Sequence, residues 1–262
     1  MLPELPEVET FKRYFDSTAL NHVIKEIYIK DDRVLNLNPK SFKEFIIGKK
    51  FSSSRRHGKY LFVDLNPAIL VFHFGMTGDL DYFNEIDDEP IHTRVLFQFE
   101  NNHYLSYISQ RMFGRLDLTD KIESFLQEKN LGPDAFKMSF EDFKLALKRR
   151  SAYAKSALMD QSLIAGIGNI YSDEILFQSQ IHPKTKINML SDSKLEQLFN
   201  TIKKVLQYGI DKKGELSAYS DDFLIPHREK EGNCPTCHAK IQRLELSGRH
   251  GFFCPKCQVQ LT

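Results

Sequence analysis

The sequence has no long apolar run and almost no net charge, and each absence excludes a class of protein. A membrane helix needs about 18 consecutive apolar residues, and no apolar stretch in the 262-residue sequence approaches that length. We therefore expect no membrane association. No secretory leader pattern stands at the start, which favours a cytoplasmic protein. The formal net charge is only +1. If the protein binds nucleic acid, its basic residues must therefore gather on one face.

Cysteine is scarce and confined to the last part of the chain, as two C-x-x-C pairs: Cys234, Cys237, Cys254 and Cys257. Four thiolates at this spacing can close a tetrahedral zinc site that has no open position for catalysis. Two disulfides or free thiols are the alternatives, and two bridges are uncommon in a cytosolic chain. Two strands are expected between the pairs, around Ser247 and Gly248. We therefore predict one structural Zn²⁺ on a β-hairpin finger, where Arg249 is either a surface charge or a phosphate contact.

In the rest of the chain, the spacing of the hydrophobic residues changes twice. The stretch PEVETFKRYFDSTAL predicts a helix, with Pro6 in its first turn and Val8, Phe11 and Phe15 on one face. Short alternating or apolar runs over 23–118 predict an all-β sandwich or barrel. Helical spacing follows from 131 to about 213, with Ser139 as an expected N-cap. The segment 214–233 is polar and irregular.

A glycine-rich connection interrupts the helical region in LMDQSLIAGIGNIYSDEILFQ. Gly166 and Gly168 let the backbone approach another surface closely, and Asn169 opens the next helix. Free amides at such a helix start form an anion site suited to a DNA phosphate. An ordinary helix connection is the alternative. The zinc finger downstream favours nucleic-acid binding.

Several stretches together resemble the formamidopyrimidine-DNA glycosylase/endonuclease VIII family of base-excision repair enzymes. They are PELPEVET at 3–10, GKYL at 58–61, HFGMTG at 73–78, RMFGR at 111–115, LGPDAF at 131–136, MDQSLIAGIGNIYSDEI at 159–175, and the CPTC…GR…CPKCQ finger. The resemblance implies an α+β multidomain fold. An N-terminal helix and β-sandwich (1–125) would precede a helix–two-turn–helix domain (126–222) and a zinc-finger module (223–262).

The resemblance also implies a chemistry. The α-amine of Pro3 would attack C1′ of the damaged nucleotide, and the base would leave as an imine forms. The imine would then act as an electron sink for the eliminations that cut the strand. Glu4 would be the general acid/base, and Glu7 would position the helix start. Lys59 would assist on the far side of the site, and Arg249 would grip the phosphates around the lesion.

Extrusion of a base from the duplex leaves a hole, which an apolar wedge can fill. The resemblance assigns this to Met76, with Arg111 and Phe113 beside it, whereas core packing is the alternative for Met76 and Phe113. The phosphate contacts that it implies are His73, His92, Lys155, Asn169 and Arg249. Arg149 and Arg150 either add attraction for DNA or are plain surface charges. The implied partner is damaged double-stranded DNA, bound by a monomer in the bacterial cytoplasm and associated with the nucleoid.

The chain departs from the family pattern at its start. Met1 and Leu2 precede Pro3, so the nitrogen of Pro3 is an amide in this sequence. We expect translation to begin at the Leu2 codon, decoded as methionine and then removed. The alternative is a lyase-deficient or non-catalytic paralogue that binds damaged or abasic DNA.

Lesser departures concern base specificity. Ser109-Gln110 stands before Arg111 where the family commonly has Asp-Pro, and 214–234 lacks a segment that covers the extruded base in oxidised-purine enzymes. IPHR at 225–228 resembles the endonuclease VIII side, which leaves an oxidised-pyrimidine specificity open. The expected function is a DNA glycosylase and AP lyase for oxidised, formamidopyrimidine- or 8-oxopurine-type bases. A zinc-ribbon transcription or RNA factor would leave PELPEVET and HFGMTG unexplained.

Overall fold

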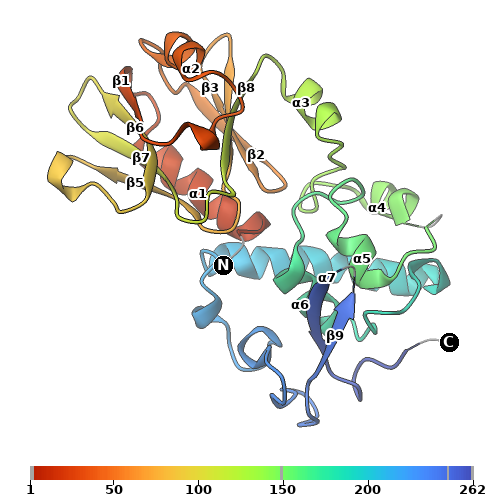
Figure 1. Ribbon diagram of the computed structural model, residues 1–262. Helices are drawn as coiled ribbons and strands as arrows, with labels where there is room; N and C mark the ends of the chain where they lie inside the picture. Colours follow the sequence, from red (N-terminus) through yellow and green to blue (C-terminus); the bar gives the residue numbers. More distant parts are fainter. Residues whose placement is uncertain (1–2, 148–149, 247, 261–262) are drawn as a thin grey trace. The chain divides into compact units, whose positions relative to one another are not determined.

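The computed structural model describes residues 3–147, 150–246 and 248–260 (Figure 1). The chain divides into two compact units. The first contains Pro3 and 8–129, and the second contains 4–7 and the chain from Asn130 onward. Helix α1 (Leu5–Thr18) begins in the second unit and continues in the first. Predictions that concern Met1, Leu2, Arg149 and Ser247 lie outside the described residues.

The first unit is a sandwich of two antiparallel four-stranded sheets, as the sequence predicts. One sheet has the order β1-β6-β7-β5 and the other β2-β3-β4-β8. The bounds of its strands are β1 Ile24–Ile29, β2 Ser53–His57, β3 Tyr60–Asp64, β4 Ile69–His73, β5 Gly78–Phe83, β6 Thr93–Phe99, β7 Tyr104–Ser109 and β8 Arg115–Thr119. Val8 and Phe15 of α1 are fully buried in the same cluster as Phe72 and Phe97 from the two sheets. The predicted apolar face of α1 is therefore part of the sandwich core.

This unit also contains two short helices that the sequence does not predict, one within 23–118, where strands are expected, and one after that range. Helix α2 (Pro39–Ile46) starts at Asn38, whose side chain accepts from the amide of Lys40, and buries Phe42 and Ile46 four residues apart. Helix α3 (Ile122–Glu128) buries Phe125. The 3₁₀ turns η1 (Asp32–Val34) and η2 (Ile86–Asp88) lie in the connections. A single pair of buried residues is too weak a periodic signal to predict a helix of this length.

Two turns of the sandwich are packed against each other. The amide of Arg111 donates to Oγ1 of Thr77 over 3.0 Å. Gly75 has a φ of +60°, and a Cβ there would lie 2.4 Å from the backbone nitrogen of Gly114. Only glycine fits this approach, so the turn that carries Met76 is locked beside the turn that carries Phe113.

The second unit is helical, with a β-hairpin in its C-terminal part. Its helices are α4 Phe140–Leu147, α5 Ala154–Met159, α6 Asn169–Gln178 and α7 Asp192–Asp211, and its 3₁₀ turns are η3 Ile187–Met189, η4 Leu216–Ala218 and η5 Ile225–His227. The predicted cap is present, because Oγ of Ser139 accepts from the amide of Asp142. Figure 1 shows α6 and α7 beside each other, and buried residues of both helices share one core.

The hairpin consists of β9 (Gln242–Leu246) and β10 (Arg249–Phe253), paired in antiparallel register. Its buried face joins Leu224 and Phe177 through a small cluster around the cysteines. The predicted two-stranded finger is confirmed. Among the described helices, none combines the length and apolar character required to cross a bilayer.

Gly75 offers a test of the packed turns. Gly48 also has a positive φ (+78°), but a Cβ there would meet nothing within 4 Å. We expect Gly48→Ala to cost about 1 kcal/mol of unfolding free energy from backbone strain alone. Gly75→Ala should cost about 2 kcal/mol more, because the added methyl overlaps backbone that cannot rotate away. Urea unfolding of the two variants measures the difference, and equal losses would contradict the packing.

Candidate functional site

The carboxylate of Glu4 is held at the start of α6. Its side chain is 1% exposed, Oε1 accepts from the amide of Ile170 over 2.8 Å, and Oε2 accepts from the amide of Gly168. The amide of Leu5 donates to the carbonyl of Gly166 over 3.0 Å. A negative charge at a helix N-terminus is stabilised by the unpaired amides and the helix dipole. The residue that follows Pro3 is thus fixed in position by one segment far along the chain, residues 166–170.

Three amides of the glycine-rich turn donate to side chains of the protein itself, which the sequence does not predict, and a phosphate contact of this turn stays a prediction. Those of Gly168 and Ile170 donate to Glu4, and that of Gly166 donates to Oε1 of Gln161 over 3.0 Å. The turn is an anion site, as its glycines indicate, but its anion is a carboxylate of the same chain. Sequence spacing could not reveal this, because Glu4 lies more than 160 positions away.

Glu7 lies beside Glu4 and is 7% exposed. Its Oε2 accepts from the amide of Glu4 over 2.8 Å, and its Oε1 accepts from the hydroxyl of Tyr171 over 2.9 Å. Burial raises the pKa of Glu7 to about 7, and the neighbouring charge of Glu4 acts in the same direction. Glu7 therefore orients the peptide group that joins Glu4 to Pro3.

Lys155 forms an ion pair inside the second unit. Its side chain is 1% exposed, and Nζ lies 2.5 Å from Oδ1 of Asp173 and 3.0 Å from Oγ of Ser172. The other carboxylate oxygen of Asp173 accepts from Nε of Arg228 over 2.8 Å. Burial lowers the pKa of Lys155, and the charge of Asp173 opposes the shift. The structure gives this lysine an internal partner, and its contact with DNA stays a prediction.

Asn169 connects α6 to the finger. Its Nδ2 donates to the carbonyl of His250 over 3.0 Å. Arg249, the neighbour of His250, is exposed at the start of β10, and Arg150 is exposed before α5. Two predicted phosphate contacts, Asn169 and Arg249, are thus brought together. Sequence reasoning missed Tyr171 and Asp173, because residues of α6 are buried on all sides and give no amphipathic signal. It also gave no role to Arg228, which follows the short 3₁₀ turn η5 in an irregular segment.

The predicted wedge residues lie on the two packed turns of the first unit. Phe113 is 55% exposed, so the core-packing alternative is wrong for its ring. Met76 is half-buried and Arg111 is exposed. An apolar side chain, an aromatic ring and a guanidinium are therefore displayed on one rigid pair of turns.

The other predicted residues of the first unit lie in different surroundings. His92 is exposed and has a φ of +70°, Lys59 is half-buried, and Pro3 is buried. The ring of His73 packs on Tyr60 with centroids 4.8 Å apart. Burial, followed by the charges of Lys59 and Arg115, lowers the pKa of His73 to about 4. At neutral pH this imidazole is uncharged, so any phosphate contact it makes is a hydrogen bond without an ionic component.

The four cysteine sulfurs fit a zinc ion. Their Sγ atoms all lie within 4.8 Å of one another, with 3.8 Å between Cys234 and Cys257 and 3.5 Å between Cys237 and Cys254. Tetrahedral zinc with about 2.3 Å bonds places sulfurs about 3.8 Å apart. A disulfide would need about 2.05 Å. The arrangement therefore supports a structural zinc and rejects the disulfide alternative.

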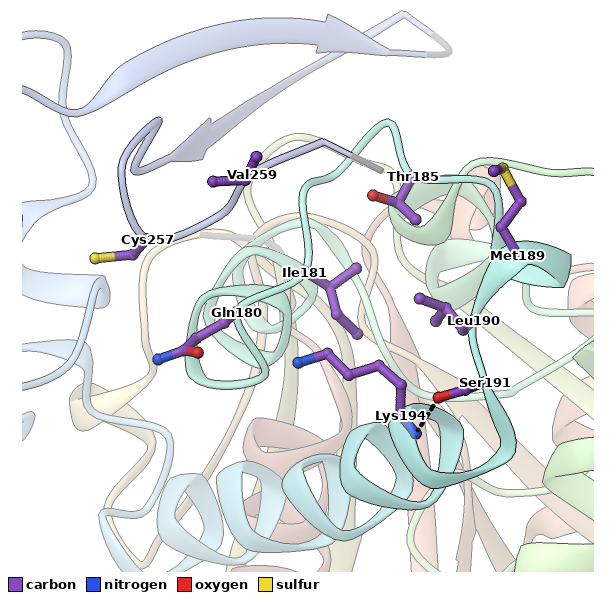
Figure 2. Close-up of a pocket in the computed structure, with 9 residues that line it drawn as sticks. All are labelled: Gln180, Ile181, Thr185, Met189, Leu190, Ser191, Lys194, Cys257 and Val259. Carbon is purple, nitrogen blue, oxygen red and sulfur yellow. Dashed lines mark hydrogen bonds between the residues drawn. The ribbon is translucent and has the colours of Figure 1, made fainter. Parts of the chain in front are cut away.

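A separate cavity lies between the start of α7 and the zinc module (Figure 2). Its lining is mainly apolar, with Ile181, Leu190 and Val259, and Lys194 reaches toward it. Of the site residues predicted from the sequence, only Cys257 contributes to the lining. This cavity is therefore distinct from the predicted catalytic residues.

Three family models match the chain. They are described as the formamidopyrimidine-DNA glycosylase N-terminal domain, over residues 2–116, its H2TH domain, over 131–220, and a zinc finger found in FPG and IleRS, over 233–259. The matches follow one another in the order that the resemblance implies.

Whole proteins and solved structures agree with these matches. The chain is 30% identical to a formamidopyrimidine-DNA glycosylase of Listeria innocua, covering 98% of the chain and 100% of that protein. It is 32% identical to one of Streptococcus pyogenes, with 98% of each covered. A Lactococcus lactis enzyme solved with abasic-site DNA has a TM-score of 0.88 at 29% identity, with 98% of this chain and 100% of that chain covered. The same enzyme with Fapy-dG DNA has a TM-score of 0.89 at 28% identity and the same coverage.

The zinc site can be tested by removal of one ligand. Cys254→Ser should lower bound zinc from about one ion per chain to nearly none, because structural zinc binding and folding of such modules are coupled. His238→Asn removes an exposed non-ligand side chain at a left-handed position beside Cys237 and should keep the zinc. Metal analysis of both purified variants measures this. Full zinc in Cys254→Ser would contradict the four-sulfur site.

Proposed function

This chain belongs to the formamidopyrimidine-DNA glycosylase family, and on that basis we propose that Pro3 and Glu4 are its reacting groups. The protein is a base-excision-repair DNA glycosylase with AP lyase activity that acts on oxidised bases in DNA. The observation that carries the assignment of residues is the buried carboxylate of Glu4, directly after Pro3 and held by the start of α6.

The proposed chemistry uses the nitrogen of Pro3 as nucleophile. A free secondary amine forms a bond to C1′ while the bond from C1′ to the base breaks, and the base leaves with that electron pair and takes up a proton. The attached nitrogen then loses its proton, the C1′–O4′ bond breaks and O4′ is protonated, so that the opened sugar is joined to Pro3 as an iminium ion. Glu4 exchanges the protons on the sugar, because a fixed carboxyl close to the nucleophile meets the geometric requirement for proton transfer. Glu7 holds the Glu4 amide and so orients the peptide that carries Pro3. Lys59 and Arg249 assist from the sandwich and the finger.

Binding of the damaged duplex would use both units. Met76, Arg111 and Phe113 would fill the space that the extruded base leaves. The proposed phosphate contacts are His73, His92, Arg150, Lys155, Asn169 and Arg249. These contacts go to the backbone, so they give salt-dependent affinity without sequence preference.

We keep three further expectations as proposals. The domains are 1–125, 126–222 and 223–262, the protein acts as a monomer, and it works in the bacterial cytoplasm at the nucleoid. The binding-only paralogue and the endonuclease VIII-like specificity gain no support from the relatives named above.

Borohydride trapping on abasic-site DNA tests the nucleophile. Protein whose first residue is Pro3, verified by mass, should give a covalent adduct, whereas protein that retains Met1 and Leu2 should give about 100-fold less, because an amide nitrogen cannot form an imine. Pro3→Asn in the processed protein replaces the secondary amine by a primary one and should change the pH dependence of trapping. Equal adduct from processed and unprocessed protein would remove Pro3 from the mechanism.

The wedge has a matched control on the same unit. Phe45 of α2 is 57% exposed, close to the 55% of Phe113. Phe113→Ala should weaken binding to abasic-site duplex about tenfold, because base–aromatic stacking contributes about 1–3 kcal/mol. Phe45→Ala should bind as the unaltered protein does. Fluorescence anisotropy with damaged and intact duplex measures both, and equal losses would refute the wedge.

A further inference from the structure

A buried chain of hydroxyl groups reaches Glu7 from the segment after α7. The hydroxyl of Tyr219 donates to that of Tyr171 over 3.1 Å, which donates to Oε1 of Glu7 over 2.9 Å. Tyr171 is 1% exposed and Tyr219 is 6% exposed. The other oxygen of Glu7 accepts from the amide of Glu4. Every donor in this chain points toward the Glu7 carboxylate.

Two glycines make room for this arrangement. A Cβ on Gly209, inside α7, would lie 2.7 Å from the hydroxyl of Tyr171 and 2.8 Å from that of Tyr219. A Cβ on Gly214, whose φ is +71°, would lie 2.6 Å from Cγ of Glu7. Glycine inside a helix costs about 1 kcal/mol relative to alanine. The destabilising glycine stands at the position of α7 that lies against the hydroxyls of Tyr171 and Tyr219.

Aromatic packing fixes the outer end of the chain. Tyr219 lies against Tyr208 and Phe223, with ring centroids 5.1 and 5.3 Å away. The hydroxyl of Tyr208 pairs instead with Oγ of Ser220, over 3.2 Å, outside the buried chain. Tyr208 therefore belongs to the same aromatic cluster as Tyr219 and does not take part in the hydroxyl chain.

We propose that Tyr219 is a positioning residue for the reacting end of the protein, acting through Tyr171 and Glu7 on the Glu4 amide. This inference rests on the proposed function of Pro3 and Glu4. Each donor stabilises the ionised form of Glu7, and hydrogen bonds in a buried chain polarise one another. An ionised Glu7 is the stronger acceptor for the Glu4 amide. The peptide group that carries Pro3 is then held in one orientation before DNA binds, which favours the attack on C1′.

The groups that face this chain set the direction of its pH dependence. Glu4 faces Glu7, and Glu174 of α6 and Tyr208 of α7 act electrostatically on Tyr219. Burial and the charge of Glu4 favour the neutral form of Glu7, whereas the Tyr171 hydroxyl and the Glu4 amide favour the carboxylate. Loss of a donor must therefore raise the pKa of Glu7 further above its present value of about 7.

The test compares Tyr219→Phe with Tyr208→Phe, each of which deletes one hydroxyl from the same aromatic cluster. In Tyr219→Phe the single-turnover rate of imine trapping on abasic-site DNA should fall about fivefold at pH 7, with DNA affinity unchanged. The acid limb of its pH–rate profile should move to higher pH. In Tyr171→Phe the same rate should fall about tenfold, because the hydrogen bond that is lost goes to the charged carboxylate of Glu7. Tyr208→Phe should match the unaltered protein in rate and profile.

A second measurement does not depend on activity. Carbon NMR of protein labelled at the glutamate carboxyls, with the Glu7 signal assigned by Glu7→Gln, follows the Glu7 titration directly. Its midpoint should rise in Tyr219→Phe and in Gly209→Ala, which keeps both hydroxyls but separates them. If the unaltered protein gives no adduct, the proposed function fails while this titration still tests the hydroxyl chain. If Tyr219→Phe equals Tyr208→Phe in midpoint and in pH profile, the inference is overturned.

Discussion

The ion–amide contact between Glu4 and the start of α6 is the constraint from which the remaining features of the second unit follow. A buried carboxylate is stable only when its charge is matched, and here two backbone amides and a helix dipole supply the match. Gly166 has a structural purpose in this turn, because its φ of +118° lies in a region that residues with a side chain rarely adopt. The contact also fixes the position of Glu4, which is bonded directly to Pro3. The proposed catalytic geometry and the stability of the fold therefore depend on the same few hydrogen bonds.

Buried charge is matched a second time around Asp173. Its two oxygens hold Lys155 and Arg228, and its Oδ2 also accepts from the amide of Phe252 in β10. Removal of one member of such a group leaves an uncompensated charge, which is why buried ionic groups are sensitive to single substitutions. Through this carboxylate α6 is joined to the finger, and the side chain of Asn169 adds a second link to the same strand. The zinc ion would thus stabilise more than the finger itself, since it fixes the strand that presents Arg249.

The hydroxyl chain from Tyr219 to Glu7 is a further set of buried polar contacts, and it involves the most irregular part of the sequence. The segment after α7 has little regular structure, yet Tyr219 is buried and Glu174 accepts from the amide of Ile225. Its order comes from contacts with α6 and α7. Gly209 of α7 leaves space for the hydroxyls of Tyr171 and Tyr219. A segment that looks like a linker is in this way connected to the residues that carry the proposed chemistry.

The sequence by itself determined the strand-rich first half, the helical second half, the cluster of four cysteines and the turns that carry Met76 and Phe113. These depend on short-range patterns: hydrophobic period, C-x-x-C spacing, and glycines that only certain turns require. It missed α2 and α3, which are too short to show a period. Only the tertiary structure decided that Glu4 occupies the amides of the glycine-rich turn, that Lys155 is paired with Asp173, and that Tyr219 reaches Glu7. Each of these joins residues about 18 to 166 positions apart. Such pairings depend on burial and on the matching of charges in three dimensions, so a local sequence pattern cannot predict them.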